Sequence, residues 1–131
     1  MPETLTEAEL EFLRSVLDLA RDGDTAQLAA VIDAGVPVNL TSGAGDSLLI
    51  LAAYHNHPET VGALLERGAD TARVNDRGQT ALGAAVFRQS ADSVTRLLAA
   101  GADPAHGTRS ALDIAGFFEL PEMLALLTEG R

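Results

Sequence analysis

Apolar positions recur along this chain at a fixed spacing. A stripe of apolar residues at positions i, i+3 and i+4, which is one face of a helix, occurs three times at intervals of 33 residues. A glycine follows each stripe with the same spacing. The stripes and glycines are Leu28, Val31, Ile32 and Gly35; Val61, Leu64, Leu65 and Gly68; and Val94, Leu97, Leu98 and Gly101. This period predicts an internal repeat of short helices.

Hydroxyl residues mark the start of a second helix in each repeat. Ser47 and Thr80 are also 33 residues apart, and Ser110 follows in the third unit. Because a hydroxyl oxygen can accept hydrogen bonds from the first backbone N–H groups of a helix, we expect a helix to begin after each of these residues. The glycines end the other helix, since glycine adopts the left-handed conformation at little cost. Stacking such helix pairs buries apolar faces that one pair alone would expose.

The two ends depart from the regular repeat. Residues 1–34 fit a helix pair that is broken between Arg21 and Asp24, and Thr6 followed by Glu9 predicts a capping box. The third unit is three residues shorter than the second before its inner helix. We interpret these ends as caps, and we expect the short C-terminal cap to leave Leu124 and Leu127 partly exposed.

Two long stretches carry a family resemblance. "ERGADTARVNDRGQTALGAAV" and "LLILAAYHNHPETVGALLERGAD", together with the period of 33, resemble the ankyrin repeat over about residues 13–131. The resemblance implies an all-α fold, an ankyrin-type α-solenoid of stacked helix-turn-helix units with short β-turn fingers. It also implies one domain, residues 1–131, with an N-terminal capping helix pair (1–34), two repeats (35–67 and 68–100) and a truncated C-terminal capping repeat (101–131), as in small bacterial ankyrin-repeat proteins.

The inner-helix motif diverges from the family. Relatives often have a proline followed two residues later by a histidine. Here the proline positions hold Leu48, Ala81 and Ala111, and the histidine positions hold Ile50, Gly83 and Asp113.

Composition excludes several functions. The net charge of −10 disfavours binding to nucleic acids and to anionic lipid, because both are negatively charged. The absence of cysteine excludes disulfides, thiolate nucleophiles and cysteine-ligated zinc. The acidic N-terminus does not have the pattern of a signal peptide, and no apolar run is long enough to span a membrane. We therefore expect a cytoplasmic protein without a membrane segment or cofactor.

His55 and His57 suggest a metal or catalytic site. Asn56, between them, is at the usual glycine of the turn between the helices, and we expect His57 to fix this turn by hydrogen bonding. The resemblance places His55 on the concave surface. Because a turn separates the two histidines, we expect their side chains to diverge, and we predict neither a metal site nor catalytic residues. An enzyme or metal protein using His55 and His57 is the less favoured hypothesis.

Aromatic residues form the more informative pattern. Tyr54, Phe87 and Phe117 occupy one repeat position, at the end of the inner helix, although the chain has only five aromatic residues. The resemblance places this position at the concave groove, and burial in the core is the equally weighted alternative. If exposed, these rings and the nearby arginines have the composition of interface hot spots. The predicted partner-binding surface is Tyr54, His55, Arg77, Gln79, Phe87, Arg88, Phe117 and Phe118.

The resemblance therefore implies a non-catalytic protein–protein interaction module that binds a partner protein or peptide through its concave groove, and we expect it to be a monomer. A dedicated regulator or immunity-type inhibitor of one specific enzyme is the alternative, using the same groove.

Overall fold

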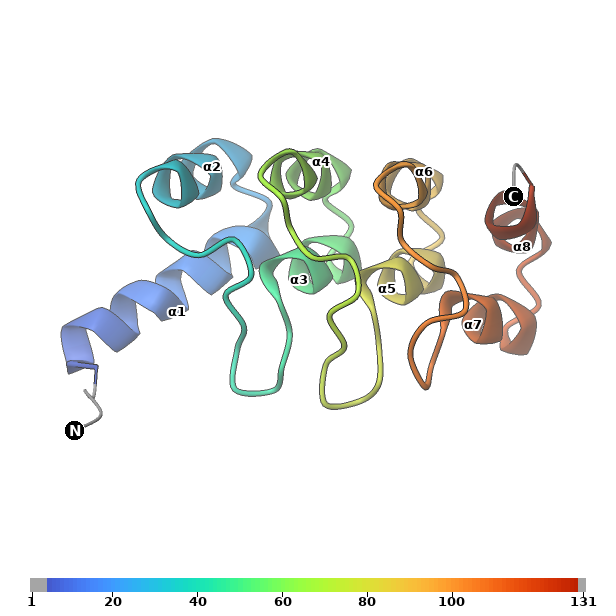
Figure 1. Ribbon diagram of the computed structural model, residues 1–131, viewed down its shortest axis with the longest axis horizontal. Helices are drawn as coiled ribbons and strands as arrows, with labels where there is room; N and C mark the ends of the chain where they lie inside the picture. Colours follow the sequence, from blue (N-terminus) through green and yellow to red (C-terminus); the bar gives the residue numbers. More distant parts are fainter. Residues whose placement is uncertain (1–4, 130–131) are drawn as a thin grey trace.

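The structure is a computed structural model that describes residues 5–129. These residues form eight α-helices joined by turns and loops (Figure 1). The helices are α1 (Glu7–Asp22), α2 (Thr25–Asp33), α3 (Leu48–Tyr54), α4 (Pro58–Glu66), α5 (Ala81–Phe87), α6 (Ala91–Ala99), α7 (Ala111–Phe117) and α8 (Pro121–Thr128).

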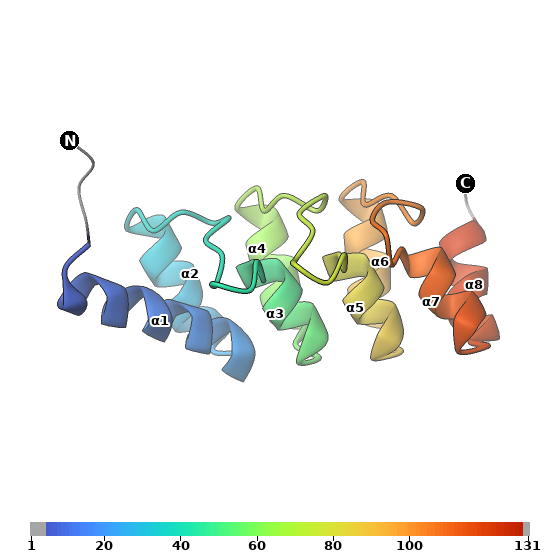
Figure 2. The same ribbon diagram turned by 90° about the horizontal axis from the view of Figure 1, so that it is seen from below.

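The helices stack in two rows. The odd-numbered helices pack one against the next as an inner row, and the even-numbered helices form an outer row behind them (Figures 1 and 2). Three loops, which we call the first (34–47), second (67–80) and third (100–110) fingers, project to the same side (Figure 1). No strand occurs within residues 5–129, and the fingers carry only isolated β-bridges, one of which joins Gln79 to Arg109. This arrangement confirms the predicted all-α solenoid.

The predicted helix starts are present in the structure. The hydroxyl oxygens of Ser47, Thr80 and Ser110 each accept a hydrogen bond of 3.1 Å from the backbone N–H three residues later. Thr6 and Glu9 form the predicted capping box at the start of α1. The inner helices α3, α5 and α7 therefore begin at residues that the repeat pattern identified.

Left-handed residues end the helices. Gly68 and Gly101 have φ angles of 84° and 94° after the outer helices α4 and α6. Asn56 has a φ of 64° in the turn between α3 and α4, as predicted. Gln89 and Glu119 adopt the same conformation, with φ angles of 55° and 53°, in the two following turns. These residues turn the chain back so that each outer helix packs on its inner helix.

The core lies between the two rows and runs through the whole stack. Leu64 and Leu97 of the predicted stripes are fully buried. The inner helices meet through small residues, including the buried Ala52 and Ala53 of α3. Small side chains allow the inner helices to approach closely, while the leucines of the outer row fill the space behind them.

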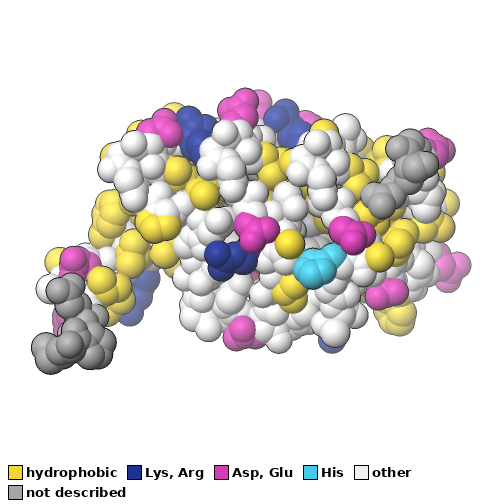
Figure 3. Space-filling view, viewed as in Figure 1, with side chains coloured by type: hydrophobic (Ala, Val, Ile, Leu, Met, Phe, Trp, Pro, Cys, Tyr) yellow, Lys and Arg dark blue, Asp and Glu magenta, His cyan; other side chains and the backbone are white. Residues whose placement is uncertain are grey.

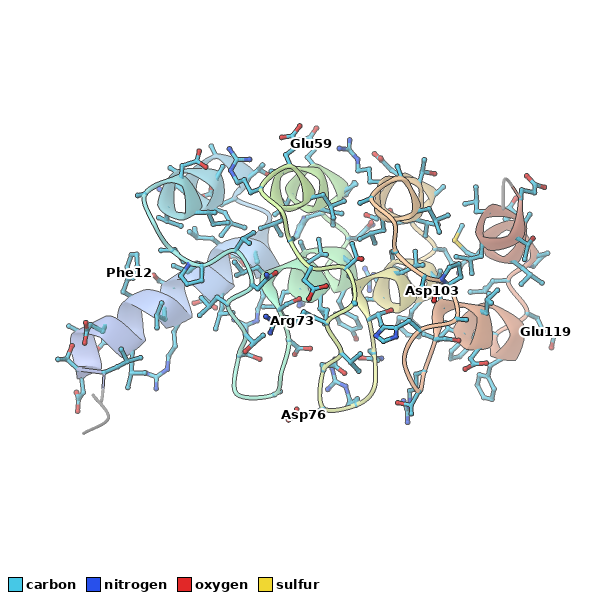
Figure 4. All side chains as sticks on the ribbon, viewed as in Figure 1. Phe12, Glu59, Arg73, Asp76, Asp103 and Glu119 are labelled. Carbon is cyan, nitrogen blue, oxygen red and sulfur yellow. The ribbon has the colours of Figure 1, made fainter. Side chains whose placement is uncertain are left out.

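The ends of the solenoid are covered unequally. The first two turns of α1 extend beyond α2 (Figure 1), and Phe12 lies on them (Figure 4). Leu5, just before α1, and Leu10 and Phe12 within it are exposed. At the other end, Leu124 is exposed as expected, but the prediction for Leu127 is wrong, because it is buried. Leu127 packs into the core because α8 still has enough turns to cover α7.

Polar side chains connect neighbouring helix pairs. Arg67, at the end of α4, donates two hydrogen bonds to the Asp33 carboxylate at the end of α2, at 2.9 and 3.1 Å. The hydroxyl groups of Thr25 and Thr60 lie 2.7 Å apart. The His106 ring in the third finger hydrogen-bonds to the Ala72 carbonyl in the second, at 2.9 Å. These bonds link segments about one repeat apart, as expected for a stack in which each unit contacts only its neighbours.

No helix among the described residues is long and apolar enough to cross a membrane.

Candidate functional site

The second finger is held in shape by a buried asparagine. The Asn75 Oδ1 accepts hydrogen bonds from the backbone N–H groups of Arg77 and Gln79, both at 2.9 Å. Its Nδ2 donates to the Asp46 carboxylate of the first finger at 2.8 Å and to the Gln79 Oε1 at 3.1 Å. Asn75 is buried, so one side chain fixes the loop that carries Arg77 and Gln79 and ties it to the first finger. Asp76, at the tip of this finger, extends away from the helices (Figure 4).

A polar pocket lies between these fingers and the inner helices. It has a volume of about 170 Å³, and we call it the arginine pocket. Its lining residues come from α1, from α3 and its C-cap, and from the first two fingers. They are Arg21, Asp46, Ile50, Leu51, Tyr54, His55, Arg77 and Gln79. Of the predicted surface, the structure thus brings Tyr54, His55, Arg77 and Gln79 together in one pocket.

The aromatic side chains form a continuous exposed row. The Tyr54 and Phe87 rings are stacked with an interplanar angle of 3° and a centroid separation of 6.2 Å. Their exposed fractions are 37% and 42%, so these rings line the surface and are not core. The row continues to Phe118, whose ring meets Phe87 edge-on at 5.6 Å. The sequence aligned Phe117 with Phe87, but in the structure Phe117 is 80% exposed and contacts Phe118 at 4.9 Å.

The difference between Phe117 and Phe118 follows from helix geometry. Phe117 is the last residue of α7 and Phe118 is its C-cap. Successive residues of a helix point about 100° apart, so only one of the two rings can face α5. The register of the repeat alone does not decide which one does.

A second pocket lies farther along the groove. It has a volume of about 420 Å³, and we call it the phenylalanine pocket. Three phenylalanines and Ile114 give it an apolar wall, while the third finger contributes Thr108 and Arg109. Its lining residues are Gln79, Phe87, Thr108, Arg109, Asp113, Ile114, Phe117 and Phe118. Gln79 lines both pockets, so they are neighbours along one groove.

The groove is less acidic than the protein as a whole. Two arginines and one aspartate line the arginine pocket, although the chain carries a net charge of −10. Partial burial lowers the pKa of His55, and the nearby charges of His57, Arg21 and Arg88 lower it further, while Asp22 opposes them. Arg88, the remaining predicted residue, is exposed and lies close enough to His55 to act on its charge. Acidic side chains are instead spread over the face seen in Figure 3.

The two histidines of the α3–α4 turn have separate environments. The His55 ring packs edge-on against Tyr54 at a centroid distance of 5.3 Å. The His57 Nε2 hydrogen-bonds to the Arg21 carbonyl at 2.7 Å. The predicted hydrogen bond of His57 therefore exists, but it fixes the end of α1 in the preceding helix pair and not its own turn. A Cβ on Gly23 would lie 2.5 Å from the His57 Nδ1, which explains the glycine there.

Within residues 5–129, no group of three or more histidine, aspartate or glutamate side chains is placed to hold a metal ion. His106 is in the third finger, where it bonds to the second.

Sequence reasoning missed several groove residues. Arg21 and Arg109 line the two pockets, yet neither belongs to the aromatic repeat position that drew attention to the groove. Asn75 was not identified either, because an asparagine in a polar loop is common. Its position four residues before Gln79, inside the finger motif, is the one pattern that could have indicated its structural role.

Comparisons with known proteins agree with this geometry. A family model of ankyrin repeats in three copies matches residues 16–108. An ankyrin repeat protein of Pseudomonas aeruginosa is 47% identical over 51 residues, which are 39% of this chain and 30% of that protein. The crystal structure of the human ASB11 ankyrin repeat domain matches with a TM-score of 0.77 and 30% sequence identity, over 88% of this chain and 54% of that one. The chain thus spans less than two thirds of each of these relatives.

Proposed function

Because the chain belongs to the ankyrin-repeat family, we propose that it binds a partner protein or peptide in the groove that contains the arginine and phenylalanine pockets. Ankyrin repeats are generally protein–protein interaction modules and typically non-enzymatic scaffolds. Binding to this groove, by the eight residues predicted from the sequence together with Arg21 and Arg109, is the specific part of the proposal.

The exposed aromatic row carries this proposal. Tyr54, Phe87 and Phe118 contact one another in series, yet each leaves more than a third of its surface exposed to solvent. Large aromatic rings are costly to leave in water, and they are enriched at the centres of protein interfaces. The row lies on capped helices in a fixed stack, so a partner would meet a preformed surface and little conformational entropy would be lost on binding.

The experiment compares two phenylalanines of similar exposure. Phe87 is 42% exposed in the groove, and Phe12 is 48% exposed on the projecting half of α1. The wild-type protein, Phe87→Ala and Phe12→Ala are immobilised and incubated with an extract of the cells that produce the protein, and the bound proteins are quantified by mass spectrometry. We expect a specific partner to be retained by the wild-type protein and Phe12→Ala and to be lost from Phe87→Ala.

Stability must be measured in parallel. Leu97 is fully buried, so Leu97→Ala should lower the unfolding free energy by roughly 2–5 kcal/mol. Phe87→Ala should leave the thermal midpoint nearly unchanged. If Phe87→Ala destabilises the fold as much as Leu97→Ala, or if partner capture is equal for Phe87→Ala and Phe12→Ala, the groove is not the binding site.

A further inference from the structure

We infer that the groove recognises an extended peptide segment with an acidic side chain in the arginine pocket and a large apolar or aromatic side chain in the phenylalanine pocket. This inference rests on the proposed function and adds the chemistry of the partner to it.

The arginine pocket has the chemistry of a carboxylate site. Arg21 and Arg77 both line it, one from α1 and one from the second finger, and Arg21 uses one guanidinium nitrogen to donate to the Asp18 carboxylate at 2.6 Å. Asp46 is the one acidic residue in its lining, and its Oδ1 already accepts a hydrogen bond from the Asn75 side chain. Arginine guanidinium groups bind carboxylates with paired, charge-assisted hydrogen bonds. A basic side chain would instead face two like charges here.

The phenylalanine pocket has the chemistry of an apolar side-chain site. Phe87, Phe117 and Phe118 surround it, and Ile114 lies among its lining residues. Its volume of about 420 Å³ is ample for one aromatic side chain. Arg109 and Asp113 in the lining are of opposite charge, so they give no net preference for a charged ligand. An apolar or aromatic side chain would therefore bind best in this pocket, because it would remove the rings from contact with water.

The spacing of the pockets fits an extended chain. The arginine pocket lies against α3, and the phenylalanine pocket lies against α5 and α7. Neighbouring helices pack about 8–10 Å apart, and a point midway between α5 and α7 is one and a half such spacings from α3, so the pockets are separated by roughly 12–15 Å. An extended peptide advances about 3.3 Å per residue, which places the two side chains about four residues apart.

Gln79 is positioned to bind the peptide backbone between the two pockets. Its Oε1 accepts hydrogen bonds from the Asn75 Nδ2 and, at 3.4 Å, from the Arg77 Nε. These bonds orient the side chain so that its amide NH₂ is the part able to donate to a ligand. A peptide carbonyl above Gln79 would receive that bond.

The test is selection from a random peptide library displayed on phage. The library is selected on the wild-type protein and counter-selected on Phe87→Ala, so that groove binders are kept. We expect the enriched peptides to share an acidic residue about four positions from an aromatic or large aliphatic residue. The best peptide is then synthesised with a fluorescent label, and its affinity is measured by anisotropy against purified variants.

Charge reversal identifies the arginine pocket. Arg77→Glu should lower the affinity for the acidic peptide by about tenfold or more. It should raise the affinity for the same peptide with lysine in the acidic position. Phe117→Ala should weaken both peptides alike, because Phe117 contributes to the other pocket. Arg73→Glu, a charge reversal at an exposed arginine that lines neither pocket, serves as the matched control and should leave the affinity unchanged.

The outcomes separate the inference from the proposed function. Peptides that require Phe87 but carry no acidic residue, or that bind Arg77→Glu and the wild-type protein equally well, would overturn the acidic–apolar assignment and leave groove binding intact. A library that yields no peptide preferring the wild-type protein over Phe87→Ala would overturn both.

Discussion

Ser93 provides a test of whether a buried hydroxyl without a hydrogen-bond partner destabilises the repeat. It lies in α6 with no exposed surface, and its hydroxyl is the one buried side-chain polar atom within residues 5–129 that has no hydrogen-bond partner. One repeat earlier, Thr60 occupies the equivalent position and hydrogen-bonds to the Thr25 hydroxyl at 2.7 Å. The residue one repeat after Thr25 is Pro58, which has no hydroxyl. Ser93 is therefore unpaired because the partner position of its repeat holds a proline.

The magnitude follows from the cost of an unpaired hydroxyl. Burying such a group without a hydrogen bond costs roughly 1–3 kcal/mol. Ser93→Ala removes this cost and leaves a void of only one atom, and alanine also has the higher helix propensity. We expect Ser93→Ala to raise the unfolding free energy by about 1 kcal/mol and the thermal midpoint by roughly 3–5 °C. Thr60→Ala should do the opposite, since it leaves the Thr25 hydroxyl without its Thr60 partner.

The assay is unfolding in urea, monitored by circular dichroism. Both variants are compared with the wild-type protein using the same slope of unfolding free energy against urea concentration. Stabilisation by Ser93→Ala together with destabilisation by Thr60→Ala would support the account. If Ser93→Ala lowers the unfolding free energy by more than about 0.5 kcal/mol, the hydroxyl makes a favourable interaction and the reasoning is refuted.

Three further predictions concern the links between repeats. Gly23→Ala should destabilise the protein by more than about 1–2 kcal/mol, because Gly23 has a φ of 74° and the added Cβ would meet the His57 ring. His57→Ala should recover part of that loss in a double-mutant cycle measured by urea unfolding. Asn75→Ala should cost roughly 2–3 kcal/mol and speed amide hydrogen exchange in the second finger, because it removes four hydrogen bonds. The bond from Arg67 lowers the pKa of Asp33, so this pair stabilises the fold above pH about 4 and loses that effect as the pH falls; Asp33→Asn should make the decrease in stability between pH 5 and pH 3 shallower.

Local patterns in the sequence predicted most of the fold. The caps at Ser47, Thr80 and Ser110 depend on one residue type and its neighbours three positions on, and all three are present. The left-handed residue Asn56 is likewise a local requirement of its turn. Such features are read correctly because the hydrogen bonds involved connect residues that are close in sequence.

The candidate site was predicted less completely, because its geometry depends on contacts between repeats. The sequence indicated that Phe117 shares a repeat position with Phe87, but Phe118 makes the contact. It also indicated that His57 makes a hydrogen bond, but not that the acceptor is the carbonyl of Arg21, 36 residues earlier. Both outcomes depend on the rotation and offset of adjacent helix pairs, which a repeat period does not specify.

Stability and the proposed binding function use different residues of this protein. Several of the polar bonds that join one helix pair to the next are made at helix ends and in the outer row, such as Arg67 to Asp33 and Thr60 to Thr25. The aromatic row lies on the exposed side of the inner helices, and Phe87 can lose its ring without opening the buried core. In a stack where each unit is held by its neighbours, surface residues of the groove can change while the scaffold persists. Substitutions in the groove should therefore alter partner choice at little cost in stability, whereas changes at Gly23 or Asn75 should alter both together.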